Sequence, residues 1–356
     1  MKIIAILYIA MASCFAEDYI RFEKYLMMHE GEAILHKEFS KLVSAPSLAL
    51  KTKQKEKLRI SIVYPGRQVS DYWRRSIASF KKRLDELNIN YEIDELLTKR
   101  SQIKEQAKKI MESLKSEPHF LIFTLDANKH KRLISQILSK GKTKLILQNI
   151  TTPLSMWEGL QPFLYVGFDH EKGSSLLVDH LQKKYPNGAK YAMLFYTEGY
   201  VSKMRGESVV ERLAKNKKWK LAGQYYTDGK AGKTKRALEE LHKREKNIDV
   251  IFTCATDIAI TTASFLKEKK ITSFINGWGG GSAEIESLKR NHGIDYTVMR
   301  INDDNGVAMA EAIKLDLQNQ THLIPQVFSG EMVVIDKETT QEELKKLKKR
   351  SFRYSN

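Results

Sequence analysis

Cysteine is almost absent from this chain of 356 residues, which holds only Cys14 and Cys254. Cys14 lies in an apolar N-terminal stretch that we expect to be removed, so Cys254 is the one thiol expected in the mature protein. A single thiol excludes a disulfide framework, and the hydrophobic core must hold the fold unaided. Because Cys254 ends the strand-like run at 250–254, we expect it to be a small buried hydrophobic residue.

Long hydrophobic runs are scarce as well. The run Ile3–Ala12 follows Lys2 and precedes "SCFAED", and it is too short to span a bilayer. A positive start, a short apolar segment and small residues before a polar continuation are typical of a secretory signal peptide. We therefore expect residues 1–16 to be a signal peptide cleaved after Ala16, and the mature protein to lie in the periplasm. Alternatively, "MASC" is a lipoprotein box that leaves Cys14 acylated.

Catalytic motifs are missing too. The nine histidines show neither H-E-x-x-H nor any other metal-ligand spacing, and no G-x-S-x-G elbow occurs. Asp303 and Asp304 are adjacent, but at an expected helix start, where carboxylates favour the helix dipole. "GWGGGS" (277–282) matches a dinucleotide-binding fingerprint only in part, because Ser282 replaces its last glycine. We expect neither an enzyme, nor a metal site, nor a resident cofactor.

The net charge of +17 raises the question of nucleic acid. The lysines are dispersed and often stand beside glutamates, as in "LEELHKREK", and no zinc-finger spacing, basic arm or RNP-type strand occurs. Solvated basic helix faces are the simpler interpretation. A preference for anionic partners or membrane surfaces is the alternative.

Apolar runs of strand length alternate with helical periodicity along most of the chain. The expected strands lie at 60–64, 91–93, 120–124, 145–148, 164–168, 191–195, 221–226, 250–254, 273–276 and 296–299. The expected helices lie at 71–88, 102–114, 131–138, 173–184, 203–215, 234–244, 258–267, 283–290 and 305–318. Such alternation predicts parallel sheets covered by helices on both faces. Ten units exceed one doubly wound sheet, so we expect an α/β fold of two lobes. Residues 17–56 are charged and helical in pattern, which indicates an N-terminal extension.

Ligands of open parallel sheets bind beyond the carboxyl ends of the strands. The residues that follow the expected strands combine amides, hydroxyls, guanidinium groups and indoles: Gln68, Ser70, Trp73, Asn149, Arg205, Thr256, Trp278 and Arg300. This combination suits a polyhydroxylated ring, with aromatic faces on its C–H side and arginines on an anionic or oxygen-rich edge. Each residue also has a simpler interpretation. Ser70 or Asp71 can cap a helix, and Trp73 can be a packing residue.

Several long stretches resemble the autoinducer-2 receptors within the ribose-binding-like family of periplasmic binding proteins. They include "YPGRQVSDYW", "TKLILQNITTP", "QPFLYVGFDH", "INGWGGGSAE" and the closing "FRYS", and the resemblance runs from about residue 57 to the C-terminus. It implies two lobes, at 57–167 with 302–326 and at 168–301 with 327–350, joined by a three-strand hinge. It also implies that the eight residues named above bind the ligand.

The ligand implied by the resemblance is autoinducer-2, a furanosyl borate diester that carries one negative charge and brings its own boron. The implied partner is the periplasmic domain of a LuxQ-like membrane sensor histidine kinase. One alternative is a pentose-type sugar-binding protein of an ABC importer. Another, a cytoplasmic repressor with the same core, requires an N-terminal helix-turn-helix that "MMHEGEAILHKEFSKL" does not provide.

Overall fold

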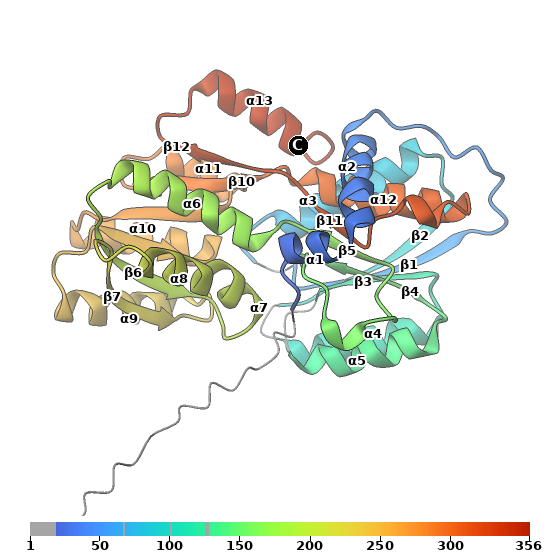
Figure 1. The fold of residues 1–356 in the computed structure, drawn as a ribbon, viewed down its shortest axis with the longest axis horizontal. Coiled ribbons are helices and arrows are strands. Elements are labelled where there is room, and N and C mark those ends of the chain that lie inside the picture. Colours follow the sequence, from blue (N-terminus) through green and yellow to red (C-terminus); the bar gives the residue numbers. More distant parts are fainter. Residues whose placement is uncertain (1–18, 67, 100–101, 125–127) are drawn as a thin grey trace, which may run out of the picture.

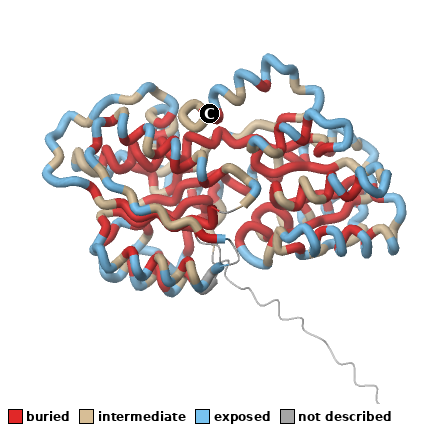
Figure 2. Tube along the Cα trace, turned by 180° about the vertical axis from the view of Figure 1, so that it is seen from behind, coloured by how far each residue is buried: buried red, intermediate tan, exposed pale blue. Residues whose placement is uncertain are grey.

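The computed structural model describes residues 19–66, 68–99, 102–124 and 128–356. The expected signal peptide and Cys14 lie outside the described residues. Within them the chain forms two six-stranded sheets with helices on their faces, and Figure 1 shows the two lobes side by side. Buried residues concentrate along the strands of both lobes in Figure 2, whereas the outer helices expose much of their surface. The expected two-lobed α/β fold is confirmed.

Lobe one is built on a fully parallel sheet with the strand order β11-β5-β4-β3-β1-β2. Its strands are β1 (Leu58–Tyr64), β2 (Tyr91–Leu97), β3 (Phe120–Phe123), β4 (Lys144–Gln148), β5 (Leu164–Gly167) and β11 (Val327–Ser329). Its helices are α3 (Tyr72–Glu86), α4 (Ile103–Lys115), α5 (Asn128–Lys140) and α12 (Asp303–Leu317). The inner strands are near-continuous apolar runs because helices cover both faces of the sheet.

Lobe two has the strand order β12-β10-β9-β8-β6-β7, in which only β12 runs antiparallel to its neighbour. Its strands are β6 (Lys190–Phe195), β7 (Lys220–Tyr226), β8 (Val250–Thr253), β9 (Phe274–Gly279), β10 (Tyr296–Arg300) and β12 (Met332–Asp336). Its helices are α6 (His170–Lys184), α7 (Tyr200–Ser202), α8 (Ser208–Ala214), α9 (Ala231–Arg244), α10 (Thr256–Lys269) and α11 (Ser282–Leu288). Cys254, at the end of β8, is buried as expected, and burial raises the pKa of its thiol to about 12.

The chain passes between the lobes three times: after β5, after β10 and between β11 and β12. The boundary expected between residues 326 and 327 is wrong, because β11 at Val327–Ser329 pairs with β5 in the sheet of lobe one. The helix expected at 203–215 is also not regular. A π-helical turn at Lys203–Glu207 separates α7 from α8, and Arg205 lies within this turn.

The N-terminal extension forms α1 (Phe22–Met28) and α2 (Glu30–Ser44), and α2 covers the edge strand β11. Oε2 of Glu32 accepts the backbone N–H of Gln326 at 2.8 Å. One turn later, Nε2 of His36 lies 3.2 Å from the backbone nitrogen of Ser329. These two side chains therefore bind backbone amides at the sheet edge, where a further strand could otherwise form hydrogen bonds. Both contacts lie next to the third crossover.

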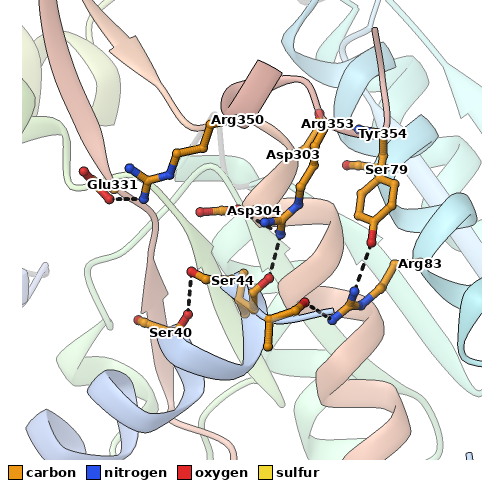
Figure 3. Close-up of polar contacts among 12 residues, drawn as sticks. Ser40, Ser44, Ser79, Arg83, Asp303, Asp304, Glu331, Arg350, Arg353 and Tyr354 are labelled. Carbon is orange, nitrogen blue, oxygen red and sulfur yellow. Dashed lines mark hydrogen bonds and ion pairs between the residues drawn. The ribbon is translucent and has the colours of Figure 1, made fainter. Parts of the chain in front are cut away.

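The C-terminal segment connects the two lobes. Helix α13 (Gln341–Ser351) follows β12 of lobe two, whereas the residues after it bind lobe one. Asp303, at the start of α12, accepts hydrogen bonds from the backbone nitrogens of Tyr354 and Ser355 at 2.7 and 2.9 Å. Figure 3 shows Arg353 pointing to the end of α2, where it donates to the carbonyl of Val43 at 2.6 Å. The C-terminal segment thus meets the end of α2 beside α12.

Candidate ligand-binding site

Six of the eight expected site residues are buried: Trp73, Asn149, Arg205, Thr256, Trp278 and Arg300. Gln68 and Ser70 are partly exposed in the segment between β1 and α3. The strand-end positions of these residues agree with the sequence prediction. Only some of them are in contact with one another. Asn149, Arg205, Trp278 and Arg300 belong to one close cluster, and the other four lie outside it.

Trp278 is the centre of the cluster. The guanidinium carbon of Arg205 lies 3.7 Å from the centroid of its ring, and that of Arg300 lies 5.8 Å from it. The indole N–H points to Oγ of Ser174 at 3.4 Å. A Cβ atom at Gly173 would lie only 2.8 Å from the indole, so a glycine is needed at this position of α6. Trp278 therefore brings together two arginines that are 95 positions apart in the sequence.

Arg300, at the end of β10, is a buried cation among aromatic rings. Its side chain stacks on Tyr72 of lobe one at 4.2 Å and lies 5.7 Å from the centroid of Phe168. The backbone of Gly279 approaches so closely that a Cβ there would lie 2.3 Å from Nη2. Burial lowers the pKa of Arg300, and among the residues that the structure describes it forms no ion pair. Within the described part of the chain, its charge is therefore balanced by aromatic rings and by the more distant carboxylates of Glu284 and Asp71.

Arg205 reaches the cluster from the π-helical turn of lobe two. Nη1 donates to the backbone carbonyl of Cys254 at 3.0 Å, and Nη2 lies 3.2 Å from Nε2 of His170. Its own backbone carbonyl accepts the hydroxyl of Ser174 at 2.8 Å. The wider turn places this guanidinium over Trp278, consistent with the frequent use of π-turns at functional sites.

Asn149 extends the cluster into lobe one. Its backbone adopts a left-handed conformation with φ of 65°, which asparagine tolerates better than most residues. The backbone N–H donates to the carbonyl of Val166 at 2.8 Å, and the side-chain amide lies 3.3 Å from Nε2 of His170. Asn149, His170, Arg205 and Trp278 thus form a continuous set of contacts across both lobes.

Trp73, Ser70, Gln68 and Thr256 are less closely tied to this cluster. Trp73 is buried against Tyr64 and Tyr72, with ring centroids 4.6 and 4.8 Å apart. Oγ of Ser70 lies 3.4 Å from the backbone nitrogen of Tyr72, which fits the alternative of a helix-start contact. Thr256 begins α10. In the part of the chain that the structure describes, neither Gln68 nor Thr256 forms a hydrogen bond with Arg205 or Arg300.

A second set of contacts closes the lobes beside the cluster. Asp71 does not cap α3. Its Oδ2 accepts the hydroxyl of Ser282, in lobe two, at 2.8 Å and Nε of Arg75 at 2.6 Å. Nη2 of Arg75 donates to the same hydroxyl at 2.9 Å. Burial alone would raise the pKa of Asp71, but the hydrogen bonds from Arg75 and Ser282 lower it below its usual value.

The sequence analysis missed His170, Tyr72 and the contact between Asp71 and Ser282. A signal for His170 was present, because "FDH" directly follows the strand-like run at 164–168. Tyr72 and Ser282 carried no comparable signal, since their roles depend on how the lobes meet.

Two amides of the loop "GWGGGS" are bound within the protein and do not face a phosphate group. The backbone nitrogens of Trp278 and Gly280 donate to the buried carboxylate of Glu284 at 2.9 and 2.8 Å. In the described part of the chain, no group of three or more histidine, cysteine or acidic side chains is placed to hold a metal ion. None of the described helices is long and apolar enough to cross a membrane.

Solved structures with this fold include several solute-binding proteins. The glucose-galactose binding protein from Geobacillus stearothermophilus is 16% identical, with a TM-score of 0.71 over 81% of this chain and 100% of its own. A protein of Actinobacillus succinogenes 130z with bound D-allose is 16% identical, with a TM-score of 0.70 over 82% of this chain and 100% of its own. A protein of Bacillus halodurans C-125 with bound myo-inositol is 13% identical, with a TM-score of 0.70 over 83% and 100%. At these identities, the likeness establishes the fold.

The sequence itself matches a family model described as "Periplasmic binding protein domain". The match spans residues 60–321, which include all eight expected site residues and the first two crossovers between the lobes. The chain therefore belongs to this family of periplasmic binding proteins.

Proposed function

We propose that this chain is a periplasmic receptor of the LuxP type, which binds autoinducer-2 as a furanosyl borate diester between its two lobes. The observation that carries the proposal is the state of Arg300. Arg300 is about 5% exposed, and its guanidinium lies against Tyr72 and Trp278 and forms no ion pair with any residue that the structure describes. A buried cation without a countercharge is costly. An anionic ligand supplies that countercharge, and a neutral sugar does not.

The remaining site residues fit a small oxygen-rich ring. Arg205 and Arg300 would form charge-assisted hydrogen bonds to the borate and ring oxygens, and Trp278 and Trp73 would cover the apolar faces. Gln68, Ser70, Asn149 and Thr256 would fix the orientation of the hydroxyl groups. The boron belongs to the ligand, and the receptor is proposed to act without catalysis or a resident cofactor.

The proposed output is lobe closure, because contacts from both lobes to one ligand favour the closed state by the difference in affinity between the two states. The proposed partner is the periplasmic domain of a LuxQ-like sensor histidine kinase, which would distinguish the open from the closed receptor.

The second candidate is the sugar-binding component of an ABC importer. It is supported by the solved structures of similar fold, whose bound ligands include D-allose and myo-inositol. Sugar recognition favours carboxylates that accept hydrogen bonds from hydroxyl groups, and the first turn of α10 carries one, Asp257. The buried charge of Arg300 favours the anionic ligand.

Calorimetric titration with dihydroxypentanedione, with and without borate, tests the proposal. We expect borate to tighten binding to the wild type. Arg300→Met keeps the apolar stem but removes charge-assisted bonds worth about 1.5–3 kcal/mol each, so affinity should fall roughly ten- to a hundredfold and most of the borate effect should disappear. Trp73→Ala, the matched control, should weaken binding but keep the borate effect. Tight binding of D-arabinose that ignores borate in all three proteins would instead establish the importer component.

A further inference from the structure

His170 is the first residue of α6 and follows the first crossover between the lobes. Its side chain is almost fully buried, with about 1% exposed. One ring nitrogen meets both lobes: Nε2 lies 3.3 Å from Oδ1 of Asn149 and 3.2 Å from Nη2 of Arg205. The ring also meets Trp278 edge-on, with centroids 5.1 Å apart. His170 thus links three of the expected ligand-binding residues.

The contact with Arg205 fixes the protonation of that nitrogen. A guanidinium group has hydrogen-bond donors only, so Nε2 must offer it a lone pair. The imidazole is then neutral, with its proton on Nδ1. An unprotonated Nε2 cannot donate to an amide oxygen. An oxygen 3.3 Å from it would be repelled, because both atoms would present lone pairs.

The amide of Asn149 must therefore be turned. The oxygen and nitrogen of an asparagine side chain are assigned from their hydrogen-bond network. Here Oδ1 would be repelled by the lone pair of Nε2, so Nδ2 faces His170, and Nδ2 and the guanidinium of Arg205 share that one lone pair. The backbone of Asn149 is held by the carbonyl of Val166 in β5, so rotation of the side-chain amide is the remaining choice. With Nδ2 toward the histidine, Oδ1 is left to accept a hydrogen bond.

We propose that His170 is a positioning residue that sets which hydrogen bond Asn149 makes with the ligand. Through its Nε2 lone pair, it turns Oδ1 of Asn149 outward, and the site then selects a ligand with a hydroxyl donor at that position. This inference rests on the proposed function in one respect, namely that Asn149 faces the ligand. It applies equally to a borate diester and to a sugar.

The first test needs no ligand. Long-range nitrogen–proton NMR spectra of the full-length mature protein, labelled at histidine nitrogens and recorded near neutral pH, report which ring nitrogen carries the proton. The signals of His170 are identified by their absence from His170→Gln. We expect the neutral form with the proton on Nδ1. A proton on Nε2, or a doubly protonated ring, would overturn the inference.

The second test compares two replacements of His170. The amide oxygen of His170→Gln can accept from both Asn149 and Arg205, so this variant should bind within a fewfold of the wild type. His170→Phe keeps a ring but has no acceptor, so binding of dihydroxypentanedione with borate should weaken roughly ten- to a hundredfold. Circular dichroism checks that both variants are folded. Equal affinities of His170→Phe and the wild type would contradict the proposal, and the NMR test decides it if His170→Phe does not fold.

The two proposals fail in different ways. If the chain is not an autoinducer-2 receptor, borate has no effect on any variant, and D-arabinose replaces dihydroxypentanedione as the probe in the same comparison. If His170 does not orient Asn149, the NMR spectra show the other protonation state whichever ligand binds.

Discussion

Gly306 is a position at which α12 packs tightly against α3. A Cβ atom there would lie 2.1 Å from Oγ of Ser79 and 2.5 Å from both the backbone nitrogen of Phe80 and the backbone oxygen of Ser76. Two of these three atoms belong to the backbone and cannot rotate away. The packing of the two helices therefore depends on the missing side chain.

We expect Gly306→Ala to lower the free energy of unfolding by about 1–3 kcal/mol, the usual cost of an overpacked core. Urea denaturation followed by circular dichroism measures it. The matched control is Gly232→Ala in the first turn of α9, where nothing lies within 4 Å of an added Cβ. That variant should be unchanged or more stable by less than about 1 kcal/mol. Equal stability of the two variants would contradict the close helix contact.

At the scale of single residues, the sequence predicted correctly that Trp278 and Arg300 lie at strand ends, because apolar runs reveal where strands stop. Arg205 lies farther on, in the π-helical turn that follows β6 and α7. The sequence did not reveal which of these residues touch. The stacking of Arg300 on Tyr72 and the contact of Asp71 with Ser282 join the two lobes, and spacing along the chain carries no information about such contacts.

The first turn of α12 is the element that holds the C-terminal segment. Asp303 binds the backbone of the last residues, and Oδ1 of Asp304 lies 3.1 Å from Nη2 of Arg353 (Figure 3). Although Arg353 favours its charged form, burial dominates and raises the pKa of Asp304 to about 6. The adjacent aspartates therefore have a structural role beyond the expected interaction with the helix dipole.

The raised pKa of Asp304 predicts a pH dependence of stability. Between about pH 4 and 6, the folded protein holds a proton that the unfolded chain has lost, so stability should fall as pH rises through this window. A shift of about two units corresponds to roughly 3 kcal/mol. Urea denaturation from pH 4 to 7.5 should show this decline in the wild type and a flatter profile in Asp304→Asn. Parallel profiles would show that Asp304 does not titrate in this range.

At the scale of elements, nine expected helices and ten expected strands follow long periodic or apolar segments, and these signals predicted the sheets well. The strands β11 and β12 were not expected. β11 has only three residues, too few for a pattern to identify it. β12 is as long as β10, and its apolar start, MVVI, is a signal that the sequence analysis missed. The sequence predicted a regular helix where the π-helical turn at Lys203–Glu207 lies, because one additional residue in a turn barely changes the apolar periodicity.

For the molecule as a whole, the described conformation has the lobes in contact. Asp71 and Arg75 of lobe one share the hydroxyl of Ser282, and the hydroxyl of Tyr200 lies 3.4 Å from the backbone nitrogen of Thr151. These contacts can form only when the lobes are close. In the proposed hinge motion, these contacts would be lost when the lobes separate.

We expect ligand saturation to reduce the radius of gyration measured by small-angle X-ray scattering, because closure brings the lobes together. Ser282→Ala removes contacts made only in the closed state, so ligand affinity should fall by about two- to tenfold through a smaller closed population. Ser264→Ala, whose exposed hydroxyl bonds within α10, is the control and should bind like the wild type. A radius of gyration that ignores ligand would rule out the hinge mechanism.

The cover that α2 places on β11 has a consequence for self-association. An uncovered edge strand offers its amides to any other extended chain, and exported proteins pass through unfolded states in which such pairing leads to aggregation. By binding the amides of Gln326 and Ser329, Glu32 and His36 leave this edge with fewer free donors. The N-terminal extension thereby makes this sheet edge less able to pair with another extended chain.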